Sequence, residues 1–313
     1  MIEPFSSNKA KVSIGMPVYN GGKYIRRALD SLLGQTYKNF ELIISDNAST
    51  DETKEICEEY AKRDKRIKYI RQKENMGATN NFNFVLEQAT GEYFMWASYD
   101  DIWEPSFISE LVELLRTNPV AALAFCHFDN IDIHGMHVRS YPKISRLFSA
   151  RTRLGRAHHF MWFKGRDGKA NLMCGVMQTS VIQAVGGFPF DLGECSIDNL
   201  MLFRLALIGD FIMSNQLLFH KRLVPGSGSF RAWSFADWHT YRSAYRQIIL
   251  QSDIPSWEKA MLTGSAIFMQ MFFLIHMNQV GFCRLARHVI VFTRRRIGSG
   301  IRFIKSIPGH RLQ

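Results

Sequence analysis

The sequence has few cysteines and none of the short glycine motifs that bind common nucleotides. Its five cysteines include no C-x-x-C pair and are odd in number, so a reducing compartment is favoured over a disulfide framework. The G-x-G-x-x-G turn and the G-x-x-x-x-G-K-[ST] loop are both absent. These absences disfavour a hydride-transfer enzyme of the Rossmann type and a phosphate-cradling P-loop.

Targeting and membrane-spanning signals are also scarce. The N-terminus lacks a basic segment followed by an apolar run, so no signal peptide is expected. Residues 260–277 contain no Asp, Glu, Lys or Arg and reach the lower length limit of a membrane span. Thr263, Gln270 and His276 within them favour a buried or interfacial helix. The predicted location is cytoplasmic, with peripheral attachment to the inner face of the cell membrane.

Acidic residues are fewer than basic residues, and the C-terminal segment has none. The chain has 39 Lys and Arg against 28 Asp and Glu, a net charge of +11, which favours anionic partners. Residues 284–313 contain no acidic residue but eight basic ones. These are Arg284, Arg287, Arg294, Arg295, Arg296, Arg302, Lys305 and Arg311. An anionic membrane surface is the expected partner of this segment, with a solvated helix end as the alternative.

Apolar strands and amphipathic helices alternate over the first 125 residues. Strands are predicted at residues 12–16, 40–45, 67–70, 93–96 and 121–125. We expect Pro17 to end the first of them. The alternation predicts an α/β fold with a mostly parallel sheet and helices on both faces. The pattern weakens after about residue 130, and helical patterning returns after residue 229.

Polar residues follow the carboxyl ends of four predicted strands, where ligands of such sheets bind. They are Tyr19 and Asn20, Asp46, Asn75, and the pair Asp100 and Asp101. Adjacent carboxylates repel each other, and Mg²⁺ or Mn²⁺ would remove that repulsion. In the alternative interpretation, one carboxylate of the pair caps the next helix and the other is solvated.

Two long segments have motifs that are specific as a set. They are VSIGMPVYNGGKYIRRALDSLLGQTYKNFELIISDNASTDET and ENMGATNNFNFVLEQATGEYFMWASYDDIWEPSFI. Together they resemble the inverting family 2 glycosyltransferases of bacterial polysaccharide synthesis, which have the GT-A fold. The resemblance is strong over residues 11–118. It continues more weakly to about residue 230, through GVMQTSVIQAVGGFPFD and SIDNLMLFRLALIGDF.

The resemblance implies a nucleotide-sugar site along the predicted rim. Asp46 would bind the nucleobase, usually uracil, while Asn75 and Gly77 would close a loop over the nucleotide. Asp100 and Asp101 would ligate a Mg²⁺ or Mn²⁺ ion that bridges the diphosphate. The full set of implied nucleotide contacts is Pro17, Val18, Tyr19, Asn20, Asp46, Asn75, Gly77, Asp100 and Arg222.

The resemblance also implies that Asp198 is the general base, with Asp191 and Glu194 as nearby alternatives. Arg222 matches the arginine of a basic motif, in which His220 could act as a further ligand of the metal or diphosphate. Three positions depart from the family pattern, where acids or a histidine are common: Ser98, Ile197 and Val224.

These observations predict a GT-A domain over residues 1–230 and a helical, basic region over residues 231–313. The nucleotide-sugar half would span about residues 11–125 and the acceptor half about residues 126–230. The predicted function is transfer of a sugar from a nucleotide-diphosphate sugar, preferably a UDP-sugar, to an acceptor hydroxyl with inversion. The acceptor would be a glycan or a lipid-linked molecule, in the synthesis of cell-surface polysaccharide or lipid-linked oligosaccharide.

Three other functions fit parts of the pattern. A sugar nucleotidyltransferase would need a glycine-rich basic loop, whose spacing PVYNGGKYIRR does not have. A catalytically weak nucleotide-sugar-binding protein would explain the three departures. A nucleic-acid binder would explain the net charge, but acids at the rim would repel phosphates, so no nucleic-acid partner is expected.

Overall fold

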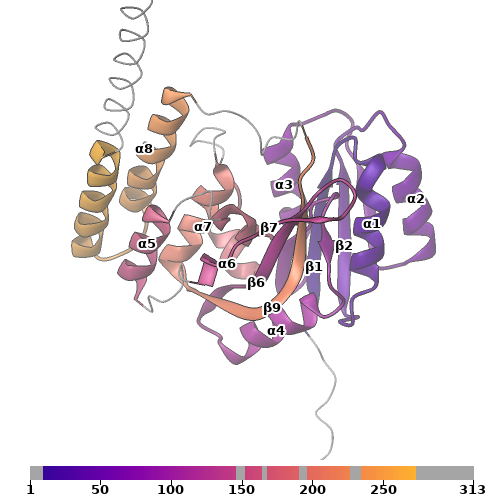
Figure 1. Ribbon diagram of the computed structural model, residues 1–313, viewed down its shortest axis with the longest axis horizontal. Coiled ribbons are helices and arrows are strands. Elements are labelled where there is room, and N and C mark those ends of the chain that lie inside the picture. Colours follow the sequence, from indigo (N-terminus) through magenta and orange to yellow (C-terminus); the bar gives the residue numbers. More distant parts are fainter. Residues whose placement is uncertain (1–9, 146–151, 164–167, 190–195, 226–233, 273–313) are drawn as a thin grey trace, which may run out of the picture.

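A single curved sheet of nine strands organises the protein in the computed structural model (Figure 1). The structure describes residues 10–145, 152–163, 168–189, 196–225 and 234–272. The strand order is β3-β2-β1-β4-β8-β6-β9-β5, with β7 paired to β6. The strands are β1 (Val12–Val18), β2 (Phe40–Asp46), β3 (Ile67–Arg71), β4 (Tyr93–Trp96), β5 (Ile102–Trp103), β6 (Ala121–Ile131), β7 (His137–Ser140), β8 (Val176–Gln178) and β9 (Asp210–Arg222).

The first four strands form the parallel part of the sheet, as the alternating pattern predicted. Strands β3, β2, β1 and β4 run parallel side by side. Helices α1 (Gly22–Leu33) and α2 (Thr53–Arg63) cover one face, and α3 (Ala78–Glu87) covers the other (Figure 1). The predicted α/β class is therefore confirmed.

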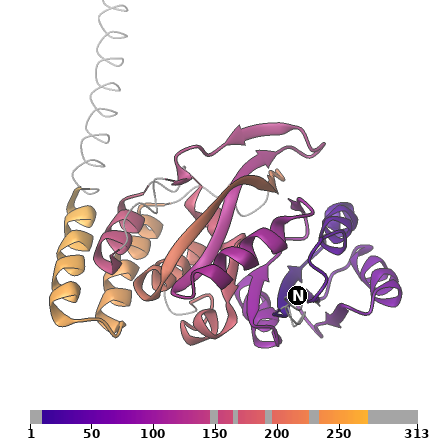
Figure 2. The same cartoon turned by 90° about the horizontal axis from the view of Figure 1, so that it is seen from below.

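The second half of the sheet is mixed, which the sequence pattern did not predict. Strand β8 lies antiparallel between β4 and β6, and β6 pairs in parallel with the long strand β9. Helix α4 (Phe107–Thr117) packs against β6 and β9. The short β7 pairs with the end of β6 and projects from the body (Figure 2). A three-residue strand such as β8 is too short for its periodicity to be recognised.

Pro17 does not end the first strand, contrary to expectation, because β1 continues to Val18. The carbonyl of Gly15 accepts from Ala97 beyond β4, while that of Val18 accepts from Asn47 beyond β2. Alternate residues of a strand face alternate neighbours, so Pro17 faces the β4 side. Pairing with β4 has already ended there, at Gly15. A proline without an N–H is tolerated at such an unpaired edge.

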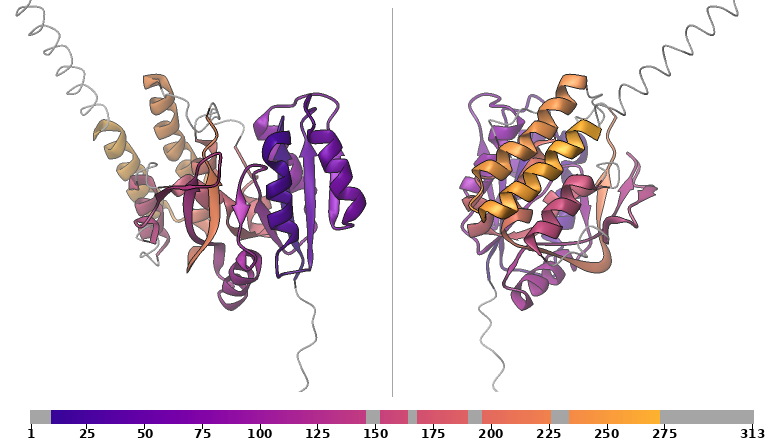
Figure 3. Two further views of the ribbon diagram at one scale, coloured as in Figure 1. Left: turned by 45° about the vertical axis from the view of Figure 1, so that its right-hand side comes forward. Right: turned by 90° about the vertical axis from the view of Figure 1, so that its left-hand side faces the viewer.

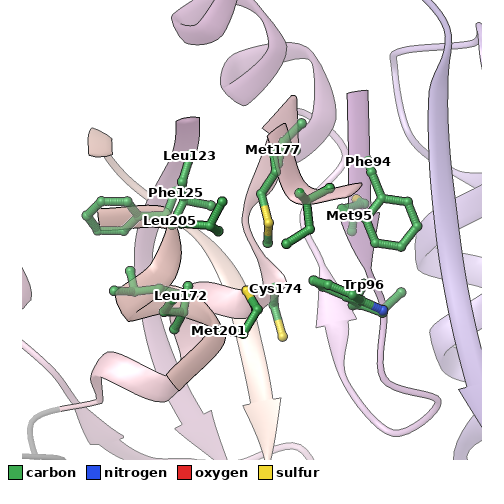
Figure 4. Packing of buried hydrophobic residues seen from close by; sticks show 14 of the residues in the cluster. Phe94, Met95, Trp96, Leu123, Phe125, Leu172, Cys174, Met177, Met201 and Leu205 are labelled. Carbon is green, nitrogen blue, oxygen red and sulfur yellow. The ribbon is translucent and has the colours of Figure 1, made fainter. Parts of the chain in front are cut away.

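The core of the second half is built around α7 (Ile197–Ile208), which packs beneath β4, β8 and β6 (Figure 4). Trp96, Met177, Phe125 and Met201 meet there and are almost fully buried. Burying a side chain of this size stabilises a fold by about 1.5–3 kcal/mol. An apolar surface nearly all round is typical of a central helix.

Smaller helices complete this half of the molecule. They are α5 (Arg153–Trp162), the 3-10 helix η3 (Lys169–Cys174) and α6 (Thr179–Ala184). Helix α5 packs against α7, and η3 lies between α7 and β4. Cys57, Cys126 and Cys174 are buried free thiols.

Two antiparallel helices lie at the end of the molecule opposite α1 and α2 (Figures 1 and 3). Helix α8 (Phe235–Gln251) begins with a capping box between Ser234 and Asp237, and residues 256–272 form the second helix. In the described part of the chain, no helix is long and apolar enough to cross a membrane. Residues 273–277 and the basic segment 284–313 lie outside the described residues.

Candidate active site

The ends of β1, β2 and β3 meet at one edge of the sheet, as predicted. Val18 lies beside Asp46 in the register of β1 and β2, and Asp46 lies beside Arg71 in that of β2 and β3. Val18 is buried, whereas Tyr19 is 43% exposed. The rim therefore offers one exposed aromatic side chain next to a buried carboxylate.

Asp46 is fully buried and its carboxylate is held by three donors. It accepts from the Ser49 amide at 2.8 Å, the Tyr69 hydroxyl at 2.7 Å and the Arg71 guanidinium at 2.8 Å. Burial, and then the hydrogen bond to Asp46, raises the pKa of Tyr69. A nucleobase N–H could reach this carboxylate only by displacing one donor. Arg71, whose side chain is 37% exposed, is the one most free to move.

Tyr69 and Arg71 are functional candidates that the sequence interpretation missed. Arg71 stands at the end of the third strand, on the rim that the strand-end rule already identified. The rule pointed to Asn75 in the loop after this strand, although Arg71, the last residue of the strand itself, lies on the same rim.

The predicted nucleotide loop at Asn75 and Gly77 is organised by Asn47. Its amide nitrogen donates to the Asn75 side chain at 2.8 Å, and its oxygen accepts from the Met76 amide at 2.9 Å. Gly77 has a φ of +83°, which favours glycine. The buried Asn47 thus fastens this loop to the end of β2, a role that its position in a turn did not suggest.

Backbone strain is concentrated around the same rim. Within the described ranges, the residues other than glycine with positive φ are Asn20, Ala48 and Ser196. Asn20 follows β1, Ala48 follows β2, and Ser196 precedes α7. The Asn20 side chain accepts from the Thr50 amide at 2.8 Å, which ties the first two loops together. Such conformations cost energy and tend to occur at functional sites.

The acidic pair lies between β4 and β5. Asp101 is 1% exposed, and its Oδ1 atom accepts from the Arg222 amide at 2.8 Å. The Ser98 side chain lies near the carboxylate and acts to lower its pKa, while the Oδ2 atom has no hydrogen-bond partner. Burial, and then the nearby charge of Asp100, raises the pKa of Asp101 to about 7. Burial also raises the pKa of Asp100. A buried carboxylate oxygen without a partner is destabilising, so this atom is a candidate ligand for a cation.

Arg222 braces the acidic pair rather than projecting from it. Its guanidinium donates to the backbone carbonyls of Asp100 and Asp132, both at 2.8 Å, and lies 5.4 Å from the centre of the Tyr24 ring. The side chain is buried. Its predicted contact with the nucleotide therefore stays a prediction, while its contact with the pair is direct.

Asp198 lies in the first turn of α7, and its carboxylate accepts from the Asn199 amide at 2.7 Å. Burial raises the pKa of Asp198. Lys221 interacts electrostatically with Asp198 and with both members of the acidic pair. This lysine was missed from the sequence, although it stands between His220 and Arg222, because only the register of β9 turns it to the opposite side from Arg222.

A second buried lysine links the predicted base to α8. The Lys169 ammonium donates to the Phe160 carbonyl at 2.9 Å and to the Tyr245 hydroxyl at 3.2 Å. Burial lowers its pKa to about 7, and the charge of Asp198 opposes that change. The Tyr245 hydroxyl is 2.6 Å from that of Tyr241. These two tyrosines of α8 therefore hold Lys169 in place near Asp198.

His220 does not join the acidic pair. Its Nδ1 atom lies 2.7 Å from the Asp129 carboxylate and its Nε2 atom 3.0 Å from that of Glu104. Both ring nitrogens thus have other partners, and a metal-ligand role for His220 finds no support. The alternative bases Asp191 and Glu194 lie outside the described residues.

The residues present fit a hard divalent cation held by two protein ligands. The unpartnered Asp101 Oδ2 atom and the neighbouring Asp100 supply the oxygen donors that Mg²⁺ and Mn²⁺ prefer. Across the described ranges, no cluster of three or more His, Cys, Asp or Glu could hold a metal ion. Water and phosphate oxygens would have to complete the coordination shell.

Sequence comparisons relate the first half of the chain to known proteins. The family model for glycosyl transferase family 2 matches residues 13–167. An uncharacterised glycosyltransferase of Rickettsia typhi is 38% identical over 122 residues, which are 39% of this chain and 37% of that protein. One from Haemophilus influenzae is 41% identical over 107 residues, covering 34% and 33%. The match thus spans about a third of the length of these relatives.

Solved structures share the fold at low sequence identity. Residues 1–349 of Staphylococcus aureus TarS with UDP-GlcNAc superimpose with a TM-score of 0.63 and 19% identity, covering 83% of this chain and 72% of that one. The mannosyltransferase PcManGT of Pyrobaculum calidifontis, with GDP-Man and Mn²⁺, gives 0.59 and 20%, covering 83% and 70%. Through its domain at residues 13–167, the chain belongs to glycosyl transferase family 2, and it has the GT-A fold.

Proposed function

We propose that this protein transfers a sugar from a nucleotide-diphosphate sugar to an acceptor hydroxyl, with inversion at the anomeric carbon. The observation that carries the proposal is the buried, unpartnered Oδ2 atom of Asp101 beside Asp100, on the rim next to the Asp46 network. We propose a UDP-sugar as donor, since an acid at the position of Asp46 suits the N–H of a pyrimidine base. TarS was solved with UDP-GlcNAc, which supports that choice.

The chemistry assigned to the chain's own residues is a single displacement. Asp198 accepts the proton of the acceptor hydroxyl while that oxygen bonds to the anomeric carbon and the bond to the diphosphate breaks. Its raised pKa makes it a stronger base than an exposed aspartate. The nucleotide diphosphate leaves with the bonding electrons, so no covalent sugar–enzyme intermediate is needed.

Asp100 and Asp101 are the proposed ligands of Mg²⁺ or Mn²⁺, and PcManGT was solved with Mn²⁺. Such an ion neutralises the charge that develops on a diphosphate leaving group. Arg222 holds the two aspartates in place through its backbone amide and guanidinium. Lys221 supplies a further positive charge between the pair and Asp198.

A glycan or lipid-linked acceptor, in cell-surface polysaccharide or lipid-linked oligosaccharide synthesis, is our proposal for the second substrate. The supporting observation is that Asp198 lies in α7, which packs against β6 in the mixed half of the sheet, whereas Asp46 ends β2 in the parallel half. The residues around it, on α7 and η3, would contact the acceptor. Peripheral attachment through the basic segment 284–313 would bring such an acceptor within reach.

A thermal-shift screen of UDP-, GDP- and dTDP-sugars, each with and without Mn²⁺, tests the donor class. At a hundredfold excess over Kd, a ligand stabilises its protein by about 2.7 kcal/mol, which corresponds to roughly 5 °C for a chain of this size. We expect that shift with UDP-sugars and Mn²⁺ only. The Asp101→Ala variant should lose the metal-dependent part.

Three results would contradict the proposal. If no nucleotide sugar stabilises the protein in a metal-dependent way, the proposal loses its basis. Release of pyrophosphate from a nucleoside triphosphate and a sugar phosphate would identify a nucleotidyltransferase instead. Hydrolysis of UDP-sugars by Asp101→Ala at the wild-type rate, with chelator present, would exclude the assigned metal ligands.

A further inference from the structure

The helix at residues 256–272 carries a row of exposed apolar side chains along its outer side. The side chains of Trp257, Met261, Phe268 and Met271 are 59%, 56%, 61% and 55% exposed. At 100° per residue, their directions fall within about 80° of one another. We call these four residues the apolar stripe. Gly264 lies in the same row, with open space where a side chain would begin.

The opposite side of this helix already packs against the protein. Leu262, Ala266 and Met269 are buried, and the Met269 carbonyl accepts from Arg242 of α8 at 3.1 Å. Trp162 of α5 donates to the Ser265 hydroxyl at 3.0 Å. Phe268 of the apolar stripe also contacts α5, since its ring centre lies 6.0 Å from that of Trp162. The helix is thus fixed mainly by its other side, and the remaining stripe residues, Trp257, Met261 and Met271, are not what joins it to the fold.

The helix also has the position that contact with a large partner requires. It lies at the end of the molecule opposite α1 and α2, with its outer side turned away from the sheet (Figures 1 and 3). Exposed apolar groups of this size, gathered on one face, mark interaction sites rather than ordinary surface.

The positive charge of the chain favours an anionic partner for this helix. The segment 284–313, which follows this helix in the sequence, carries eight cations and no acid, and the whole chain has a net charge of +11. A second copy of this chain would bring the same positive charge to the contact, which disfavours self-association. An anionic lipid surface would attract it, and Trp, Phe and Met side chains suit the boundary between headgroups and acyl chains.

We propose that the helix at residues 256–272 docks on an anionic bilayer by inserting its apolar stripe into the interface. The helix lies in the plane of the membrane and does not cross it. The cations of the basic segment 284–313 add charge attraction to this surface. The proposal goes beyond the transfer reaction, and lipid binding can fail or succeed whatever the enzyme's substrate is.

Flotation of the full-length protein with vesicles tests the proposal. Vesicles of phosphatidylcholine with 30% phosphatidylglycerol are compared with pure phosphatidylcholine, at about 0.15 M salt. The test variant is Trp257→Gln/Met261→Gln/Met271→Gln, because glutamine is polar and favours helix. We expect the wild-type protein to float with anionic vesicles, and the variant to lose at least about tenfold in partition coefficient.

The matched control is Val120→Gln/Met136→Gln, which replaces two side chains 73% and 68% exposed on other parts of the surface. It should float like the wild type, and both variants should keep the wild-type melting temperature. Absence of vesicle binding by the wild type, or equal binding by the stripe variant, would overturn the proposal. So would a dimer, seen by light scattering, that the stripe variant converts to a monomer.

Discussion

The two halves of the sheet treat their charged residues differently. In the parallel half, Asp46 has three donors, all from β3 and the loop after β2. In the mixed half, Asp101 keeps an unpartnered oxygen, and the Lys169 ammonium donates to a carbonyl and a tyrosine hydroxyl and lies over the rings of Phe160 and Tyr245. The buried carboxylate of the parallel half is hydrogen-bonded through both oxygens, whereas the buried carboxylate of the mixed half has one oxygen without a partner.

The arrangement around Asp46 suits ligand binding, whereas the arrangement around Asp101 and Lys169 suits reaction chemistry. Buried and partly compensated groups have displaced pKa values that suit proton transfer and cation binding. Around the acidic pair and Asp198 these groups are Asp100, Asp101, Lys169, Asp198 and Lys221, whereas next to Asp46 the displaced pKa is that of the Tyr69 hydroxyl. Substitutions in the two halves should therefore have opposite consequences for stability and rate.

The largest effect is expected for Asp101→Asn. Loss of the buried carboxylate should lower the rate of sugar transfer by about a thousandfold or more, since charge neutralisation at the leaving group is worth several kcal/mol. The melting temperature in chelator at pH 8 should not fall. The folded pKa of about 7 lies above the ordinary value of 3.8, so stability falls as the pH rises between these values, and the full penalty of the buried carboxylate is present at pH 8. A clear drop in melting temperature would show that the two halves do not differ as described.

The second largest effect on the rate is expected for Asp198→Asn. Removing a general base should lower kcat by roughly a hundredfold to ten-thousandfold, with donor affinity and metal-dependent thermal shifts unchanged. Asp210→Asn is the control, because Asp210 pairs with Arg156 on the far side of α7. Steady-state kinetics of the two variants would separate the roles, and an unchanged kcat in Asp198→Asn would transfer the base to another residue.

In the parallel half, Asp46→Asn should mainly affect stability and donor binding. It removes the negative partner of Arg71 and one acceptor in a fully buried site, which should cost about 2–4 kcal/mol of unfolding free energy. Chemical denaturation measures that loss, and the KM for the donor should rise. Tyr69→Phe, which removes one hydrogen bond, should cost only about 1 kcal/mol. Equal costs for the two variants would argue against a charge-centred network.

The last effect, that of Lys169→Met, is on stability alone and depends on pH. The folded pKa of about 7 lies below the ordinary value of 10.5, so between these values the unfolded chain binds a proton that the folded protein does not. Wild-type stability should therefore rise with pH across this window, by a few kcal/mol at about 1.4 kcal/mol per pH unit.

The Lys169→Met variant should lack this rise, so it should exceed wild-type stability most at pH 7 and least near pH 10. Urea unfolding at several pH values measures the difference. Lys54→Met is a matched control, because Lys54 is 46% exposed in α2. A difference between Lys169→Met and wild type that stays constant with pH would contradict the assigned pKa.

Much of the parallel half could be predicted from the sequence. Its strands are apolar runs, its helices have regular apolar spacing, and consecutive β-α units place the strand ends along one edge. That rule found Tyr19, Asp46, Asn75 and the acidic pair. It missed Asn47, whose role depends on which loop lies opposite its turn.

The mixed half escaped prediction for physical reasons. Strand β8 is too short to have a period, and its insertion between β4 and β6 depends on contacts with residues far away in the chain. His220 has a residue type suited to metal binding, but the pairing of β9 with β5 and β6 turns it toward Glu104 and Asp129. Lys169 looks like a surface residue in the sequence, yet it is buried beneath α8.

The sequence by itself determined the fold class, the family and the rim on which the acidic pair lies, because local periodicity and motif spacing are properties of neighbouring residues. Only the tertiary structure decided the charge state of that rim. Burial, the register of β9 and the packing of α8 set which carboxylate keeps an unpartnered oxygen and which lysines lie near Asp198. These depend on distances between segments that are not neighbours in the chain, and the pKa of a buried group follows such distances rather than the order of the chain.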